Sequence, residues 1–215
     1  MRIGVGVDRI DYTKGIAERF RAIERFFEQH PNRRGTFTFF QLGAPSRTHI
    51  PRYRDLVTDL EEMADQVNWK FQTDDGWKPI RLLVGHHDSN AVYTFMRAAD
   101  LCVVSSLHDG MNLVAKEFVS AKSDLDTDPG VLILSEFAGA ARDLPEALIV
   151  NPYDTEEFAA AIRKALDMGP AERAQRMTRM RERVEENNIY RWAAEFIGAL
   201  SRAKGGAPLS AMSVS

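Results

Sequence analysis

Two cationic side chains follow the first apolar run of the chain. Residues 3–7 read IGVGV, and the loop DRIDYTK behind them carries Arg9 and Lys14 just before a helical segment. Two cations beside a helix amino terminus can bind an anion such as a phosphate, because free N–H groups and the helix dipole add to the attraction. The alternative is that both are solvated loop charges. Gly4 and Gly6 do not make a dinucleotide fingerprint, since they fall within the expected strand and Arg9 takes the place of the third glycine.

A second loop, residues 105–112, combines a carboxylate with a glycine ahead of an apolar helix. Gly110 lets the backbone approach a ligand closely, and the N–H groups of 110–113 would point at whatever lies over the helix start. Asp109 is either the helix N-cap or a carboxylate that accepts hydrogen bonds from sugar hydroxyls beside a phosphate. Glu117, further along the same helix, is either solvated or an acceptor for a ribose diol.

The surrounding pattern alternates short apolar runs with amphipathic segments, which predict strands and helices respectively. The expected strands are 3–7, 36–42, 80–84, 101–104, 131–134 and 147–150. The expected helices are 15–30, 51–67, 90–98, 111–121, 155–167, 170–187 and 189–203. This order predicts an α/β fold: a Rossmann-like, mainly parallel six-stranded sheet with helices on both faces. Ligands of such sheets bind in the loops after the carboxyl ends of the strands.

Composition narrows the class of protein. The 215 residues carry 28 Lys and Arg against 31 Asp and Glu, a net charge of −3, which argues against a nucleic-acid partner. No apolar run reaches the ~18 residues of a membrane span, and the amino terminus is unlike a signal peptide. The one cysteine, Cys102, is expected to be buried and inert, and a cytoplasmic location fits it. The histidines lack metal-binding spacing, so no metal is expected. We expect one domain, 1–203, and a disordered tail, 204–215.

Four segments taken in order resemble the trehalose-6-phosphate synthase family. They are VDRIDYTKG at 7–15, HDGMNLVAKE at 108–117, PGVLILSEFAGAA at 129–141 and ALIVNPYD at 147–154. The family consists of retaining glucosyltransferases with two facing Rossmann-like domains, the GT-B arrangement. The resemblance, over about residues 3–203, implies that this chain is the C-terminal half of a GT-B fold, which holds the nucleotide sugar, without the N-terminal domain. It also implies that helix 189–203 crosses to that missing domain and exposes apolar residues in this chain alone.

The resemblance assigns roles by position. Arg9 and Lys14 match the pair that grips the diphosphate, and Asp109 matches the carboxylate that contacts the donor glucose. The matching donor-binding residues are His86, His87, Val92, Gly110, Met111, Asn112, Leu113, Val114 and Glu117. Arg47, in APSR, matches an arginine that reaches the phosphate of the acceptor. The implied reaction transfers glucose from a nucleotide-glucose, UDP-glucose foremost, to glucose-6-phosphate with retention and forms α,α-trehalose-6-phosphate, without a metal or other cofactor.

Departures from the family pattern keep other functions open. His108 stands where better-known members have Arg, and the stretch 41–47 and the loop 123–128 also differ. A glucosylglycerol-phosphate synthase or related sugar-phosphate transferase is one alternative. A non-catalytic nucleotide-sugar-binding module is another, because the acceptor domain has no counterpart here. The sequence does not decide between UDP, ADP and GDP, between acceptors, between a monomer and a homo-oligomer, or whether Met1 is a native start. We expect the chain alone to bind nucleotide without turnover.

Overall fold

The computed structural model describes residues 1–122, 128–187 and 189–205. Within these ranges the strands form one six-stranded sheet of order β3-β2-β1-β4-β5-β6, and every neighbouring pair is parallel. The strands are β1 (Arg2–Arg9), β2 (Phe37–Ala44), β3 (Ile80–Val84), β4 (Leu101–Val104), β5 (Val131–Ser135) and β6 (Leu148–Val150). The predicted α/β class and each predicted strand are confirmed. Most of the expected tail, 206–215, and most of the 123–128 loop lie outside the described residues.

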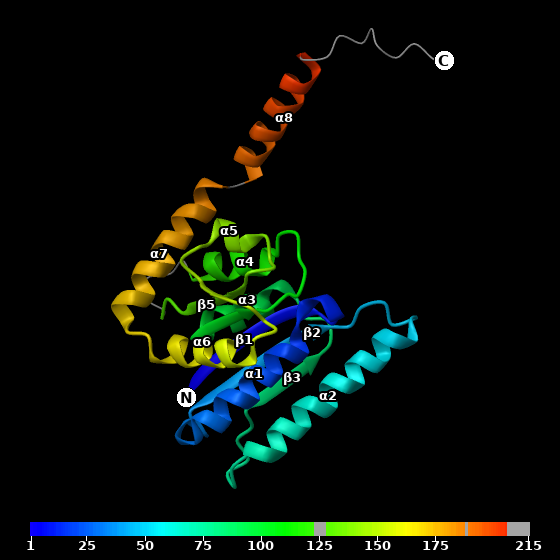
Figure 1. The fold of residues 1–215 in the computed structure, drawn as a ribbon, viewed down its shortest axis with the longest axis vertical. Helices are drawn as coiled ribbons and strands as arrows, with labels where there is room; N and C mark the ends of the chain where they lie inside the picture. Colours follow the sequence, from blue (N-terminus) through cyan, green and yellow to red (C-terminus); the bar gives the residue numbers. More distant parts are fainter. Residues whose placement is uncertain (123–127, 188, 206–215) are drawn as a thin grey trace.

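Helices cover both faces of this sheet (Figure 1). They are α1 (Ile16–Gln29), α2 (Pro51–Phe71), α3 (Ser89–Ala98), α4 (Leu113–Ala121), α5 (Ala140–Asp143), α6 (Thr155–Asp167), α7 (Pro170–Glu186) and α8 (Ile189–Gly205). Short 3-10 turns occupy Tyr12–Lys14 (η1) and Pro31–Arg33 (η2). The seven predicted helices are present, although α2 runs one turn further than its apolar stripe indicated and α4 begins two residues later than predicted. The sequence pattern did not predict η1, η2 or α5.

The strands read as continuous apolar runs because the sheet is buried on both faces. Along β4, Leu101 and Val103 join the core under α1, α2 and α6, whereas Cys102 and Val104 join the core under α3, α4 and α7. This alternation is the two-residue period of a strand, and each face needs its own apolar set.

The strand order places a topological switch point between β1 and β4. From β1 the chain adds β2 and β3 on one side, then returns to add β4 on the other side of β1. The loops after β1 and β4 therefore meet, and the Leu107 N–H donates to the Thr13 carbonyl at 2.8 Å. Gly15 has φ of +63°, and a Cβ there would lie 2.0 Å from the Ser105 carbonyl oxygen, so this close approach requires glycine.

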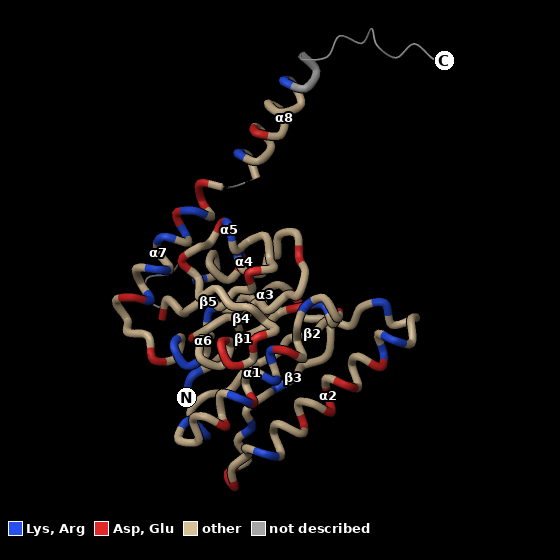
Figure 2. The backbone as a smooth tube through the Cα atoms, in the orientation of Figure 1, with Lys and Arg blue, Asp and Glu red and all other residues tan. Residues whose placement is uncertain are grey.

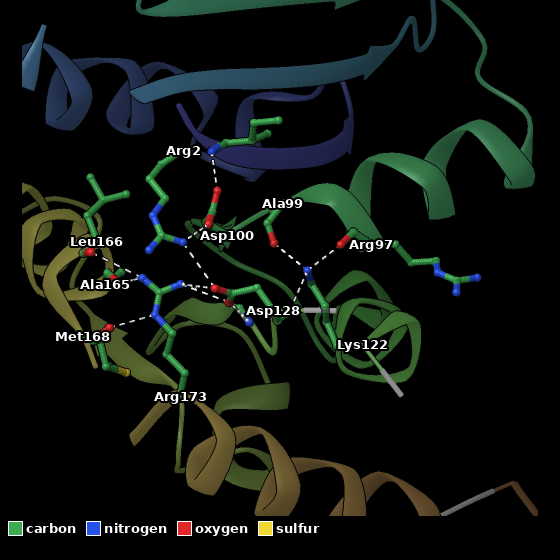
Figure 3. A network of polar contacts seen from close by, with 12 residues as sticks. Arg2, Arg97, Ala99, Asp100, Lys122, Asp128, Ala165, Leu166, Met168 and Arg173 are labelled. Carbon is green, nitrogen blue, oxygen red and sulfur yellow. Dashed lines mark hydrogen bonds and ion pairs between the residues drawn. The ribbon is translucent and has the colours of Figure 1, made fainter. Parts of the chain in front are cut away.

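A polar network closes the opposite, amino-terminal edge of the sheet (Figure 3). Asp100, just before β4, pairs with Arg2 and accepts from the backbone N–H that follows Arg2 in β1. Lys122 donates to the carbonyls of residues 97 and 99 at 2.7 and 2.6 Å, at the end of α3. Arg173 of α7 reaches carbonyls at the end of α6 and, at 3.1 Å, Asp128 ahead of β5. Arg2, Lys122 and Arg173 each join separate elements here, which indicates a structural role for their charges.

Helix α8 extends away from the body of the domain (Figure 1). Its exposed apolar side chains are Ile189, Tyr190, Trp192, Phe196, Ile197 and Leu200. Elsewhere on the surface, α2 carries an acidic run between basic residues near its two ends, and α7 carries residues of both signs (Figure 2). Among the helices that the structure describes, none has the length and apolar character needed to cross a membrane.

The buried thiol of Cys102 gives a direct test of the core. Cys102 has no solvent exposure, and burial raises its pKa to about 12. At about pH 8 only about one thiol in ten thousand would then be ionised, and the thiolate is the reactive form. We expect Ellman's reagent to leave the folded chain unmodified and to modify the urea-unfolded chain within minutes. Stoichiometric modification of the folded chain at the same rate would contradict the buried placement.

Candidate functional site

A cleft lies at the switch point between β1 and β4, at the carboxyl edge of the sheet. Its volume is about 430 Å³, and its lining residues are Val7, Asp8, Arg9, Lys14, Asp109, Met111, Asn112, Leu113 and Val114. The structure thus brings together both predicted cations, the predicted carboxylate and the start of α4. A larger groove of about 710 Å³ lies beside edge strand β6, between α6 and α7, and none of the predicted site residues lines it.

An ion pair between Lys14 and Asp109 joins the two sides of the cleft. Lys14 Nζ lies 2.6 Å from Asp109 Oδ2, and both side chains are largely shielded from solvent. Partial burial alone would raise the pKa of Asp109, but the hydrogen bond and charge of Lys14 outweigh it and hold the pKa below its usual value. Asp109 therefore stays ionised at neutral pH. The ammonium has three donors, and donors not used by Asp109 can meet an incoming anion.

The interpretation of Asp109 as a helix N-cap is wrong. The N-cap of α4 is Asn112, which has φ of +72°, a conformation that excludes it from the helix and delays the first turn to Leu113. The Asn112 side-chain amide donates to Ser106 Oγ and to Asp109 Oδ2, both at 3.2 Å. The loop is thus held by its own side chains, and Asp109 remains beside the cleft.

The positive side of the cleft combines Arg9 with the amino terminus of α4. Arg9 ends β1 with an exposed side chain that has no hydrogen bond or ion pair to any other described residue. The first N–H groups of α4 have no partners within their own helix, and its positive dipole end favours an anion. Arg9, Lys14 and the α4 terminus together make this side of the cleft positively charged, which is the chemistry that suits an anion.

The loop after β5 supports the 108–112 segment through backbone hydrogen bonds. Asp109 N–H donates to the Phe137 carbonyl at 3.2 Å, and its own carbonyl accepts from Gly139 N–H at 3.0 Å. A Cβ at Gly139 would lie 2.0 Å from the Gly110 carbonyl oxygen. The small residues after β5 therefore allow the two backbones to pack closely, and this packing fixes the position of the loop that carries Asp109.

Arg19 is a residue of the site that the sequence analysis missed. It is fully buried on α1, where its Nε donates to Ser105 Oγ at 3.0 Å and its Nη1 to Asp8 Oδ2 at 2.8 Å and to Gln41. Gly6 makes room for it, since a Cβ there would lie 2.1 Å from Nη1. Burial raises the pKa of Asp8, and the charge of Arg19 opposes that rise.

A signal for Arg19 was present in the sequence. In the helical pattern of α1 it falls between Ile16 and Phe20, on the stripe that faces the core. A charged residue on an apolar stripe, behind a strand that carries Asp8, indicates a buried ion pair.

The other predicted residues stand beside the cleft. Gly110 lies in the loop between two lining residues, and Glu117 is half-buried on α4. His86 is exposed after β3, and His87 places Nε2 3.1 Å from the Leu83 carbonyl. These histidines lie away from Asp109, because they follow β3, and β2 and β1 separate β3 from β4 in the sheet.

Two further predicted residues lie on the β2–β3 side. Val92, on α3, packs against the core under α3, α4 and α7. Arg47 follows β2 and is exposed. In the described parts of the chain, no group of three or more His, Cys, Asp or Glu side chains is placed to hold a metal ion.

The parallel sheet, with a charged cleft at its switch point, defines a Rossmann-like fold, and ligands of such sheets bind at this position. The sequence model of glycosyltransferase family 20 matches residues 1–202, so the chain belongs to this family. A trehalose-6-phosphate synthase of Sodalis glossinidius is 40% identical over 211 residues, which cover 98% of this chain and 44% of that protein.

Solved structures agree with this family. A structure described as trehalose-6-phosphate from E. coli bound with UDP-2-fluoro glucose is 41% identical, with a TM-score of 0.87, over 93% of this chain and 44% of that one. An α,α-trehalose-phosphate synthase (UDP-forming) from Burkholderia xenovorans in complex with glucose-6-phosphate matches with the same identity, TM-score and coverage. The chain thus spans less than half the length of these relatives, consistent with the expectation that it forms one part of a GT-B fold.

Substitution of Gly139 tests the packing under the Asp109 loop. Gly139→Ala places a methyl group against the Gly110 backbone, which cannot rotate aside, so we expect a loss of about 1–3 kcal/mol of unfolding free energy. Gly85→Ala is the control, because a Cβ there meets nothing within 4 Å. Urea unfolding followed by circular dichroism measures both. Equal stability of the two variants would contradict the close approach.

Proposed function

We propose that this chain forms the nucleotide-sugar-binding part of a retaining glucosyltransferase. The whole enzyme would transfer glucose from UDP-glucose to glucose-6-phosphate and form α,α-trehalose-6-phosphate. The observation that carries the proposal is the convergence of Arg9, Lys14, Asp109 and the α4 terminus on one switch-point cleft. Family membership and the named ligands of the two solved relatives supply the substrate class. The relatives are trehalose-6-phosphate synthases, which favours this acceptor over glycerol-3-phosphate.

In this proposal the diphosphate lies between the two cations and the helix start. Arg9 offers a planar pair of donors, Lys14 a point charge, and the backbone N–H groups of residues 110–113 complete the cradle. Asp109 accepts hydrogen bonds from the donor glucose. Glu117 accepts from the ribose hydroxyls, and His86, His87 and Val92 face the nucleobase. Arg47 meets the phosphate of the acceptor.

The chemistry follows from where charge develops. The acceptor hydroxyl oxygen forms a bond to the anomeric carbon as the bond from that carbon to the diphosphate oxygen breaks, on the same face of the sugar. The hydroxyl proton passes to the leaving diphosphate. Groups fixed in advance around the developing negative charge stabilise this transition state. In the proposal Arg9, Lys14 and the α4 terminus supply that stabilisation, and the reaction uses no metal.

The remainder of the enzyme would pack on the exposed apolar face of α8. That face carries the stacked pair Trp192 and Phe196, with ring centroids 5.4 Å apart, and both rings are about half exposed. Contiguous exposed apolar surface of this kind marks a protein interface. We propose that residues 1–203 form the donor domain and that α8 binds the amino-terminal portion of the synthase.

Substitution of the cations tests the diphosphate site. We expect Arg9→Ala and Lys14→Ala each to weaken UDP binding by roughly ten-fold or more, since a hydrogen bond to a charged group contributes about 1.5–3 kcal/mol. Isothermal titration of the chain measures this, with Arg163→Ala, exposed on α6, as the control. UDP affinity within two-fold of wild type in both cation variants would refute the site. Parallel titrations with ADP and GDP identify the nucleobase.

Proteolysis tests the role proposed for α8. In this chain alone we expect trypsin to cleave within 189–205 before it cleaves the sheet, because the apolar face of α8 is uncovered. Mass spectrometry of a time course identifies the first products. A helix α8 as resistant as β1–β6 would contradict an uncovered interface. We also expect this chain alone to bind UDP but not to transfer glucose to glucose-6-phosphate. Turnover by this chain alone would refute the proposal that the reaction needs a second domain.

A further inference from the structure

The loop after β2 holds Arg47 in an unusual backbone conformation. Its φ is +49°, in the left-handed region that non-glycine residues seldom adopt. The Arg47 carbonyl accepts from the Ile50 N–H at 2.8 Å, which closes a turn directly before α2. Such conformations persist where surrounding contacts fix them, and they gather at ligand-binding sites.

The Arg47 guanidinium is fixed by a tyrosine. Its Nη1 donates to Tyr53 Oη, and its Cζ lies 5.3 Å from the centre of the Tyr53 ring. Tyr53 itself is buried on the first turn of α2. The Arg47 side chain is still 55% exposed, so donors of the guanidinium face solvent and are available to a ligand.

The tyrosine is in turn bound to the loop after β1. Tyr53 Oη donates to Asp11 Oδ2 at 3.3 Å, and Arg47 Nη1 lies 4.0 Å from the same oxygen. The other oxygen of Asp11 accepts from the backbone N–H and the hydroxyl of Thr13, at 3.0 and 2.9 Å. Asp11 therefore caps η1, the turn that ends at Lys14.

The charge state of Asp11 suits this arrangement. Partial burial would raise its pKa, but hydrogen bonds from Thr13 and Tyr53 and the charge of Arg47 outweigh burial and hold the pKa below its usual value. The carboxylate is ionised at neutral pH and accepts on both oxygens at once. One side chain thus joins the turn that carries Lys14 to the residue that orients Arg47.

We propose that Asp11 and Tyr53 are positioning residues, which aim Arg47 at the acceptor phosphate and tie it to the loop that carries the donor-binding cations. This inference rests on the proposed function, in which Arg47 meets that phosphate. Tyr53 contacts no substrate and acts through Arg47. Asp11 acts on both sides, through Tyr53 on Arg47 and through the Thr13 turn on Lys14.

The experiment uses the full chain and three variants. Tyr53→Phe removes only the hydroxyl, Asp11→Asn removes the charge at nearly constant shape, and Arg47→Ala removes the group being aimed. Tyr93→Phe is the control, since Tyr93 is exposed on α3. Glucose-6-phosphate and inorganic phosphate are titrated by nuclear magnetic resonance with UDP at saturation, and UDP affinity is measured by calorimetry. The Nε–Hε resonance of Arg47 reports directly on whether its guanidinium is held.

We expect Tyr53→Phe to weaken glucose-6-phosphate binding about five-fold, the effect of one lost hydrogen bond, with UDP affinity within two-fold of wild type. Its Arg47 resonance should move towards the position of a free arginine. Asp11→Asn should weaken both ligands, and Tyr93→Phe neither. This difference between the two affinities in Tyr53→Phe distinguishes positioning from general destabilisation, which would weaken the binding of both ligands in every variant.

The outcomes separate the two claims. If Arg47→Ala leaves glucose-6-phosphate affinity unchanged, the acceptor role in the proposed function is wrong. If Arg47→Ala weakens that affinity but Tyr53→Phe and Asp11→Asn change neither it nor the Arg47 resonance, the positioning inference is overturned. Should Tyr53→Phe fail to fold, Asp11→Asn and the Arg47 resonance still decide the question.

Discussion

The guanidinium of Arg19 is buried at the switch point, and both loops of the cleft depend on it. A buried charge is tolerated where it is paired, and Arg19 is paired through Nε and Nη1, whereas its Nη2 has no hydrogen-bond partner among the described residues. Asp8 pairs with it from the end of β1, and Ser105 contacts it from the end of β4. The Ser105 hydroxyl then donates to the Gly15 carbonyl at 2.8 Å.

Arg19 thus fixes the spacing of the two loops whose tips carry the charged groups of the cleft. Removal of one partner of a buried ion pair typically costs roughly 3–5 kcal/mol, because the other charge is left uncompensated. The same requirement explains Gly6, since a side chain at that position would displace Arg19. The positions proposed for the charged groups of the cleft therefore depend on a buried residue of the core.

The two edges of the sheet use their charged residues differently. At the amino edge, Arg2, Lys122 and Arg173 all bond to carbonyls or carboxylates of neighbouring elements, which leaves that edge internally satisfied. At the carboxyl edge, Arg9 has no such partner among the described residues, and the guanidinium of Arg47 is half exposed. A cation without such a partner at Arg9, and exposed donors on Arg47, are what the general rule for parallel sheets leads one to expect at the ligand-binding edge.

The sequence was sufficient for the sheet because burial on both faces demands unbroken apolar runs, and runs such as 101–104 and 131–134 are unambiguous. It was sufficient for the meeting of Arg9, Lys14 and Asp109 in one cleft, because parallel strands bring the loops after β1 and β4 to one edge. It was insufficient for the start of α4, which depends on side-chain bonds of Asn112 within its own loop. It was also insufficient for Arg19 and Tyr53, because the partners that give them a role lie on other elements and are distant in sequence.

The Lys14–Asp109 pair shows how such a cleft can remain charged without a ligand. An isolated, partly buried ammonium or carboxylate would lose hydration without compensation, and each here compensates the other. When a diphosphate enters beside Arg9, Lys14 can turn spare donors to it, and Asp109 retains a second oxygen for sugar hydroxyls. In the proposed function, the cation and the carboxylate bind adjacent parts of one nucleotide sugar. The ion pair that stabilises the cleft would then also set the separation between the phosphate site and the sugar site.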